Sequence, residues 1–356
     1  AGLVLLIAWA FNLSVHTDAP PFQAGREKAI EAARRVVAEQ GIVLPDTWRV
    51  VAAVRGEIQS SHRFVWKQGG ESAYQQLLGS YLVPPHWQVR FATFEGDVAE
   101  RAEEYHVFLG TDAEPFQFRH ELPEARPGAR LSEDEVLQRS YRVTQAQFGA
   151  GADQLEEISI KPSKQPHRTD WLATFADREH YPMDEGEARI SVNLKGSEVA
   201  NVYRWIHIPE EWQRQEREKA TRFQIVLAIC SFVVAGCFMG GIAGGIIAWS
   251  RKQFDRGLFL SSFGLLSGIG LLNLFNSWPS VAFRFSTAQP LERSILTTVG
   301  VGLVSILVSA AAPSLIIGLI HGTKSACQSV ARSERILLGL ALGAIFAGIT
   351  ALVSSW

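Results

Sequence analysis

The first 222 residues of the chain contain no cysteine, because Cys230, Cys237 and Cys327 all lie in the C-terminal part. This absence excludes a disulfide framework from the N-terminal part, whatever compartment it occupies. Its stability must therefore come from buried apolar side chains. About 200 residues are enough to form one or two small hydrophobic cores.

Charged residues are missing from four long apolar runs in the C-terminal part: 223–249, 258–275, 295–320 and 336–356. The first run has 27 consecutive uncharged residues, whereas about 20 helical residues cross the hydrocarbon core of a membrane. A buried helix of a soluble protein is the alternative for one such run, but four in succession favour membrane spans. We therefore predict an all-α polytopic membrane region over 223–356.

The four runs also lack histidine. Proton relays, ion pumps and intramembrane metal sites need ionisable residues that face the bundle interior, so we expect none of these within the runs. A hydrogen bond between helices explains Asn273, and anchoring at a helix end explains His321.

Glycines recur every four positions in the first run, at Gly236, Gly240 and Gly244 and again at Gly241 and Gly245. Small residues at this spacing let helix backbones approach closely in a membrane. We expect this stripe to pack against another helix rather than to line a conduction path.

Lysine and arginine are unevenly distributed over the loops between the predicted spans. Loops 250–257 and 321–335 carry six of them together, whereas 276–294 carries only Arg284 and Arg293. The positive-inside rule then places the first and third loops in the cytoplasm. We therefore expect the domain that precedes the spans to lie outside the cytoplasm.

Apolar runs also stand at both ends of the chain. We expect residues 1–15 to be the end of a truncated N-terminal membrane anchor, with a signal peptide cleaved near Ala8-Trp9-Ala10 as the alternative. We likewise expect the membrane region to continue past Trp356.

Residues 16–210 pass twice from a helical pattern to strand patterns. The first pass has helical periodicity at 24–40, a short helix at 71–81, and strand patterns at 48–54, 62–66, 87–94, 104–109 and 116–122. In the second, Ser132 and Glu135 form a capping box that opens a helix to about Phe148. Strand patterns follow at 155–160, 171–175, 188–194 and 198–208.

Both passes end with a strand, a turn that contains glycine, a strand and a Pro-Glu pair. We predict an internal duplication, with a first α+β unit at 16–124, a second at 125–210 and extra material near 67–85 in the first copy. Each unit would be a helix followed by an antiparallel sheet. Residues 211–222 would form a charged juxtamembrane stalk. We expect aromatic side chains to fill the two cores: Trp48, Trp66, Trp87, Trp171, Tyr203 and Trp205.

The sequence contains no motif typical of nucleic-acid binding, phosphate binding or hydrolytic catalysis. Net charge is −7 over 1–222 and +5 over 223–356, and neither part has the basic stripe of a nucleic-acid-binding protein. The sequence has no His-Glu-x-x-His, no Gly-x-Ser-x-Gly and no phosphate-binding loop, and the strand histidines His106, His120 and His207 are expected on pleated surfaces. We assign no catalytic, cofactor-binding or metal-ligating residue. The expected partners are membrane lipid and a peptide or protein substrate on the extracytoplasmic side, for example one added to a free sheet edge.

Three stretches resemble known bacterial proteins. Residues 186–199, GEARISVNLKGSEV, resemble PepSY-type domains, which are small α+β modules outside the cytoplasmic membrane. Together with FRHELPEARPGARLSEDEV at 118–136 and HIPEEWQRQE at 207–216, the arrangement resembles the front part of CPBP-type intramembrane metalloproteases, relatives of the CAAX prenyl endopeptidases. The Glu-Glu-x-x-x-Arg helix and the His-bearing helices of that family are missing, and 210–214, EEWQR, is one residue short of the spacing. No family role is therefore transferred.

The resemblance implies a protein of the bacterial cytoplasmic membrane that forms the non-catalytic front of such a protease. Its outer domain would bind substrates or regulate access, and zinc would be held by helices beyond Trp356. The alternative is a non-enzymatic membrane sensor, scaffold or transporter subunit. In both cases we expect residues 1–356 alone to show no proteolysis and to bind no stoichiometric zinc.

Overall fold

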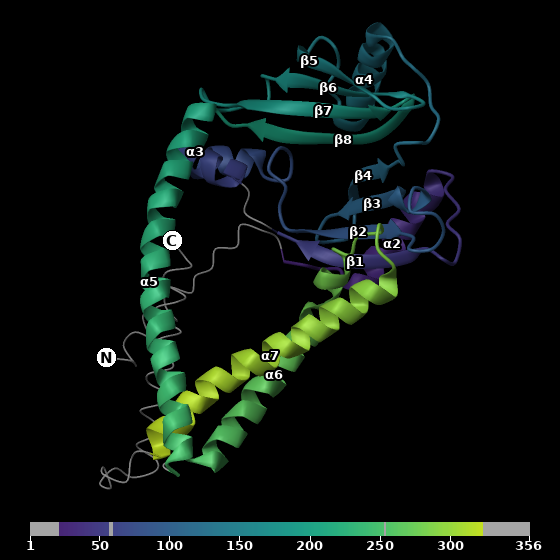
Figure 1. The fold of residues 1–356 in the computed structure, drawn as a ribbon. Coiled ribbons are helices and arrows are strands. Elements are labelled where there is room, and N and C mark those ends of the chain that lie inside the picture. Colours follow the sequence, from purple (N-terminus) through teal and green to yellow (C-terminus); the bar gives the residue numbers. More distant parts are fainter. Residues whose placement is uncertain (1–20, 57–59, 253, 323–356) are drawn as a thin grey trace. The chain divides into compact units, whose positions relative to one another are not determined.

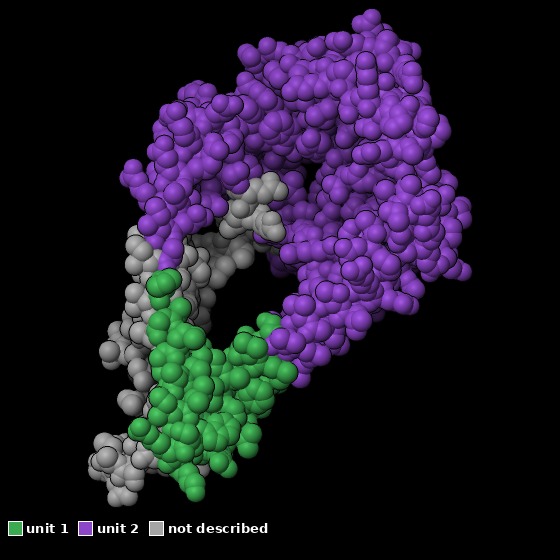
Figure 2. Space-filling model, viewed as in Figure 1, with its two compact units in different colours: residues 1–20, 231–270, 305–356 green, residues 21–230, 271–304 purple. Residues whose placement is uncertain are grey.

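The computed structural model of the chain describes residues 21–56, 60–252 and 254–322. The predicted N-terminal anchor at 1–15 and the fourth predicted span at 336–356 lie outside the described residues. Two compact units are distinguished in Figure 2. We call them the sheet unit, with residues 21–230 and 271–304, and the helical unit, whose described residues are 231–252, 254–270 and 305–322.

One antiparallel sheet of eight strands forms the centre of the sheet unit, in the order β1-β2-β3-β4-β8-β7-β6-β5 (Figure 1). The strands are β1 (Arg49–Arg55), β2 (His86–Ala92), β3 (Glu104–Leu109), β4 (Pro115–Glu121), β5 (Leu155–Lys164), β6 (Thr169–Asp177), β7 (Glu187–Lys195) and β8 (Glu198–His207). Helices follow in the C-terminal part of the chain. The predicted fold class, an α+β region followed by a helical region, is confirmed.

Each half of the sheet follows one helix. Helix α2 (Arg26–Glu39) precedes β1 to β4, and α4 (Glu133–Phe148) precedes β5 to β8. The last strands of the two halves pair with each other, with Arg119 of β4 opposite Asn201 of β8. The two sequence halves therefore share one sheet, while α2 and α4 pack on separate hydrophobic cores.

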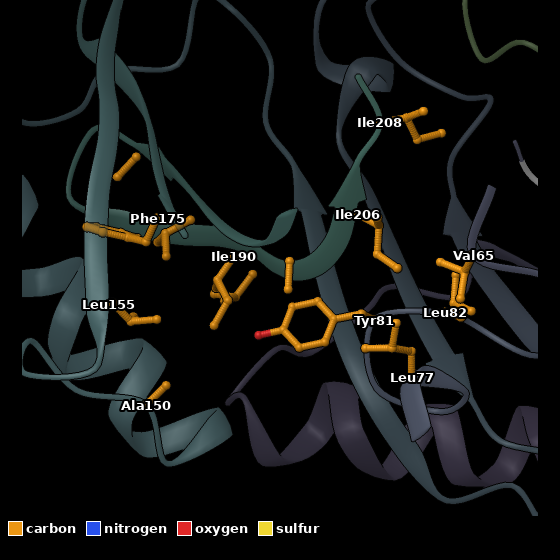
Figure 3. Packing of buried hydrophobic residues seen from close by; sticks show 14 of the residues in the cluster. Val65, Leu77, Tyr81, Leu82, Ala150, Leu155, Phe175, Ile190, Ile206 and Ile208 are labelled. Atoms are coloured by element: carbon orange, nitrogen blue, oxygen red, sulfur yellow. The ribbon is translucent and has the colours of Figure 1, made fainter. Parts of the chain in front are cut away.

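The predicted strand at 62–66 is wrong, because these residues belong to helix α3 (Ser60–Leu77). Phe64 and Val65 are fully buried there and join the core of the second half, where Tyr81 and Leu82 also lie (Figure 3). Burial against β8 outweighs the strand propensity of this aromatic and β-branched stretch. The helix has a kink at Gly70, whose φ of 68° is positive and favours glycine.

The predicted capping box at the start of α4 is confirmed. The Ser132 backbone N–H donates to Glu135 Oε2 at 2.8 Å, and the Glu135 N–H donates to Ser132 Oγ at 3.4 Å. Gly149 ends the helix with a left-handed φ of 72°. Local sequence therefore sets both ends of α4.

Three long helices follow the sheet: α5 (Glu210–Ser250), α6 (Arg256–Ala282) and α7 (Leu291–Gly322). The predicted stalk at 211–222 and the first predicted span at 223–249 lie in the single helix α5. Among the described residues, α6 and the 291–319 segment of α7 are the helices long and apolar enough to cross a membrane. They contain the second and third predicted spans.

Close packing in the helical unit involves one part of the glycine stripe. A Cβ added at Gly241 would lie 2.9 Å from Ile316 Cδ1, and one at Gly245 would lie 3.1 Å from the Leu315 carbonyl oxygen. A Cβ added at Gly244 would likewise lie 3.0 Å from Leu319 Cδ2. By contrast, nothing in the described part of the chain lies within 4 Å of such an atom at Gly236 or Gly240. The expected helix contact is therefore made by the C-terminal glycines of the stripe, Gly241, Gly244 and Gly245, against α7.

Candidate ligand-binding face of the sheet

Helices pack on one face of the sheet but not on the other. Val107 and Phe118 are opposite each other on β3 and β4, and α2 packs on the core that contains them. Successive residues of a strand point to opposite faces, so Arg119, the neighbour of Phe118, points to the other face. Its partner Asn201 points to the same side as Arg119, because residues opposite each other in a sheet share a face. We call this second side the open face, because α2, α3 and α4 pack on the cores of the first side.

Polar residues alternate onto the open face over the central strands: Gln88, Arg90, Glu104, His106, Gln117, Arg119, Glu121, Asn193 and Asn201. Half-buried antiparallel strands normally show this alternation with the polar side in water. Here several of these groups are buried instead. Arg90, Gln88 and His106 are each less than 10% exposed. Helices α2, α3 and α4 pack on the opposite face, so another part of the chain covers these residues.

The cover over Arg90 is the loop between α6 and α7. Arg90 Nη1 donates to the carbonyl oxygens of Phe283 at 2.8 Å and Phe285 at 2.7 Å. The same guanidinium forms a two-pronged ion pair with Glu104, with Nε–Oε2 at 2.7 Å and Nη2–Oε1 at 2.5 Å. Thr287 Oγ1 donates to Glu104 Oε1 at 3.3 Å. One buried arginine and its carboxylate partner therefore attach the loop to the sheet.

Phe283 adds apolar contacts to this attachment. Its side chain is 6% exposed and lies under the Arg55 guanidinium, 4.5 Å from the ring centre. The His106 ring is 6.2 Å away, centre to centre. A cation over an aromatic ring in a partly desolvated place stabilises such a contact. The loop is therefore packed on the sheet as well as hydrogen-bonded to it.

A cavity of 760 Å³ lies on the open face beside the loop. Its walls come from both halves of the sheet and from the loop residue Phe283. The polar and aromatic members of this lining include His86, Gln88, His106, Phe108, Gln117, Asn193, Asn201, Tyr203 and Trp205. Sites for small ligands commonly measure about 300–1,000 Å³ and combine apolar walls with a few polar groups.

Basic residues predominate in the charged part of the lining. Arg55, Arg119 and Lys195 stand against one acid, Glu121. Arg204 also borders the cavity, but its guanidinium lies over the Tyr81 ring of the helix-covered core. Glu121 serves two of these bases, with Lys195 Nζ at 2.6 Å from Oε2 and Arg119 Nε at 3.3 Å from Oε1. The cavity is therefore positive inside a domain whose net charge is negative.

The protonation of the groups around the loop follows from their partners. Burial alone would raise the pKa of Glu104, but the hydrogen bonds from His106 and Arg90 outweigh it and lower that pKa to about 2. Burial lowers the pKa of His106, and the nearby arginines Arg119 and Arg90 act in the same direction against the Glu104 contribution. At neutral pH the attachment therefore consists of a carboxylate, a guanidinium and a neutral imidazole.

A second ionic cluster lies on the helix-covered side where the two halves meet. His120 contacts Glu198 of β8 through Nδ1 and Glu103 through Nε2 at 3.0 Å. Burial lowers the His120 pKa, but these carboxylates outweigh it and leave that pKa raised. Arg126 also pairs with Glu103 at 2.5 Å. This cluster ties β4 to β8 and its neighbours, which is a structural role.

The predicted core position is correct for some of the aromatic residues and wrong for others. Trp87 and Trp171 are buried core residues as expected, but Trp66 is 48% exposed and Tyr203 and Trp205 line the cavity. The strand histidines were expected on pleated surfaces, yet His106 is buried under the α6–α7 loop and His120 under two carboxylates. The available signal was the polar alternation of β4 at Gln117, Arg119 and Glu121, which is equally typical of a solvent-facing strand.

No metal ligand was assigned from the sequence. Over the described ranges, no three His, Cys, Asp or Glu residues are grouped so that they could share a metal ion.

Comparisons of the chain with family models, curated proteins and solved structures gave no match.

Proposed function

We propose that the chain is a membrane-anchored binding and regulatory protein, in which a ligand on the open face influences the membrane helices through the α6–α7 loop. The observation that carries this proposal is the position of Phe283. This residue lines the cavity, and its backbone carbonyl accepts a hydrogen bond from buried Arg90. A ligand in the cavity would therefore touch a loop that connects two helices long enough to cross a membrane.

The loop contact also supports the proposed membrane topology. The α6–α7 loop lies on the sheet domain, so both belong to one side of the membrane. If α6 crosses the membrane, its first residue, Arg256, lies on the opposite side. Along the chain, α5 connects the sheet to Arg256, so on this proposal α5 crosses the membrane as well. The excess of lysine and arginine in loops 250–257 and 321–335 favours the cytoplasm for that side, and therefore an extracytoplasmic sheet domain in a multi-pass bacterial inner-membrane protein.

The proposal is tested without a natural ligand by filling the cavity covalently. The native cysteines are first replaced by alanine, and Asn201→Cys is then modified with a bulky maleimide in the full chain in lipid nanodiscs. Hydrogen exchange of the 283–287 amides is expected to change several-fold on modification, because the added group competes with Phe283 for the cavity. Lys161→Cys, on the exposed side of β5, is the matched control and should have no such effect. Unchanged exchange in the Asn201→Cys protein would overturn the proposed coupling.

Two forms of this function stay open as proposals. In one, the chain is the front of a CPBP-type metalloprotease and the sheet selects or admits substrates. In the other, it is a sensor, scaffold or transporter subunit without proteolytic activity. The coding sequence after the codon for Trp356 distinguishes them: a Glu-Glu-x-x-x-Arg helix followed by His-bearing helices supports the first, and their absence there supports the second.

A further inference from the structure

The charged side chains of the cavity are arranged around one carboxylate that the protein itself supplies. Glu121 Oε2 accepts from Lys195 Nζ at 2.6 Å, while Glu121 Oε1 lies 3.3 Å from Arg119 Nε. The Glu121 side chain is 41% exposed, whereas that of Lys195 is 13% exposed. The Arg119 side chain is 34% exposed. The carboxylate is therefore the most solvent-facing member of the group, and the lysine is held in the wall.

Arg119 is poorly satisfied by this arrangement. Its Nε is buried and makes no hydrogen bond with any described residue, although it lies near Glu121. A guanidinium binds a carboxylate best through two parallel hydrogen bonds, and a buried N–H without a partner is costly. Arg119 Cζ lies over the Phe108 ring, 5.8 Å from its centre, and both residues line the cavity. A donor of this kind is suited to an incoming acceptor.

Neutral polar groups and aromatic rings surround the two bases. Gln117 Nε2 donates to Asn201 Oδ1 at 2.8 Å across the β4–β8 seam, and Asn193 is opposite Asn201 on β7. Tyr203 and Trp205 extend the wall along β8. Such a lining suits an organic molecule with a charged end better than a bare inorganic ion.

We propose that this cavity binds an organic carboxylate, whose anionic group displaces Glu121 and is held by Arg119 and Lys195. The proposal rests on the proposed function above, since it names the ligand class of the same cavity. The carboxylate of Glu121 occupies the position between the two bases, and a ligand carboxylate reproduces its chemistry. The surplus of bases over acids in the lining favours a negatively charged occupant.

The test is isothermal titration calorimetry on the full chain in detergent. The probe is an acetylated tripeptide of glutamates, and the matched control probe has the same length but is built from glutamine with an amidated end. The acidic peptide is expected to bind, and the control peptide to bind at least tenfold more weakly. Phenyl phosphate and inorganic phosphate are titrated in parallel. Tighter binding of phenyl phosphate than of the acidic peptide would overturn the carboxylate assignment.

Three variants identify the site. Arg119→Gln and Lys195→Gln should each weaken binding of the acidic peptide by about 10- to 100-fold, because each removes a charge-assisted hydrogen bond. Glu121→Gln should strengthen it, because the internal competitor is lost. Lys161→Gln removes one positive charge from β5 outside the cavity and should leave binding unchanged. An equal loss of binding in Lys161→Gln would show that only net charge matters and would overturn the site.

The two proposals fail in distinguishable ways. Binding of the acidic peptide without a change in the exchange of the 283–287 amides supports the ligand class and overturns the coupling. A change on covalent filling at Asn201→Cys, with no binding of the acidic peptide by the wild-type chain, supports the coupling and overturns the ligand class.

Discussion

Arg90 connects the open face of the sheet to the α6–α7 loop. It lies in the middle of β2, is 7% exposed, and makes hydrogen bonds to one carboxylate and two loop carbonyls. A buried charge is tolerated only when its partners compensate for the lost hydration. The loop carbonyls therefore help to compensate for the lost hydration of Arg90, and the Arg90 hydrogen bonds hold the loop on the sheet.

Replacement of Arg90 should detach the loop. Arg90→Met leaves Glu104 without its main partner, so we expect a loss of about 3–5 kcal/mol in the free energy of unfolding of the sheet domain. The double variant Arg90→Met/Glu104→Met removes both charges and should recover part of that stability while the loop stays detached. Chemical denaturation and hydrogen exchange of the 283–287 amides measure the two effects. Equal stability of Arg90→Met and the wild type would contradict the prediction.

Glu104 makes the attachment sensitive to acid. Its folded pKa of about 2 is below the ordinary value of 4.5. A lowered carboxylate pKa contributes stability that is fully present above pH 4.5 and is lost as the pH falls towards 2. Glu104→Gln should therefore lower stability at neutral pH and flatten the decline between these values. Thermal melting from pH 7 to pH 2.5 measures it, and Glu103, whose pKa is also lowered to about 2, supplies the part of the decline that stays.

At the scale of elements, one helix has two kinds of glycine. Gly241 and Gly245 of α5 are close to α7, while Gly240 has open space within 4 Å among the described residues. Helices in a membrane associate through close packing rather than through the hydrophobic effect, so a side chain added at the contact separates them. The sequence shows the period of the stripe, but it does not show which of the glycines make the contact.

Leucine substitutions distinguish the two kinds of glycine. Gly245→Leu should lower the melting temperature of the chain in detergent, because the added side chain meets the backbone of Leu315. Gly240→Leu adds the same volume on the same helix and should have little effect. A larger loss for Gly240→Leu would contradict the position of the contact at the C-terminal glycines of the stripe.

Helix α3 is the element that local patterns described least well. Its first turns, near His62, carry residues typical of strands, yet Phe64 and Val65 pack in the core of the second half. This packing joins sequence positions that are more than a hundred residues apart, such as Phe64 and Trp212, whose ring centres are 5.2 Å apart. Long-range burial of this kind overrides intrinsic propensity and leaves no local trace.

At the scale of the whole molecule, we predict that the sheet lies on the extracytoplasmic side of the membrane. In a background without the native cysteines, Ser163→Cys on β5 should react with an impermeant maleimide in intact cells. Ser250→Cys at the end of α5 should react only after the membrane is permeabilised. Both positions are exposed, so the difference reports location rather than burial. The reverse pattern would place the sheet domain in the cytoplasm.

The sequence by itself determined the strongly patterned parts of this protein: the capping box of α4, most of the strands, the change from an α+β region to long apolar helices, and the lack of disulfides in the first 222 residues. These features depend on neighbouring residues or on composition. Tertiary structure alone decided that β4 and β8 join two halves into one sheet, that α3 fills the second core, and that Arg90 holds a loop almost 200 positions away. Each of these depends on which distant groups satisfy a buried charge, a strand edge or an apolar surface, and periodicity within one segment carries no information about a distant partner.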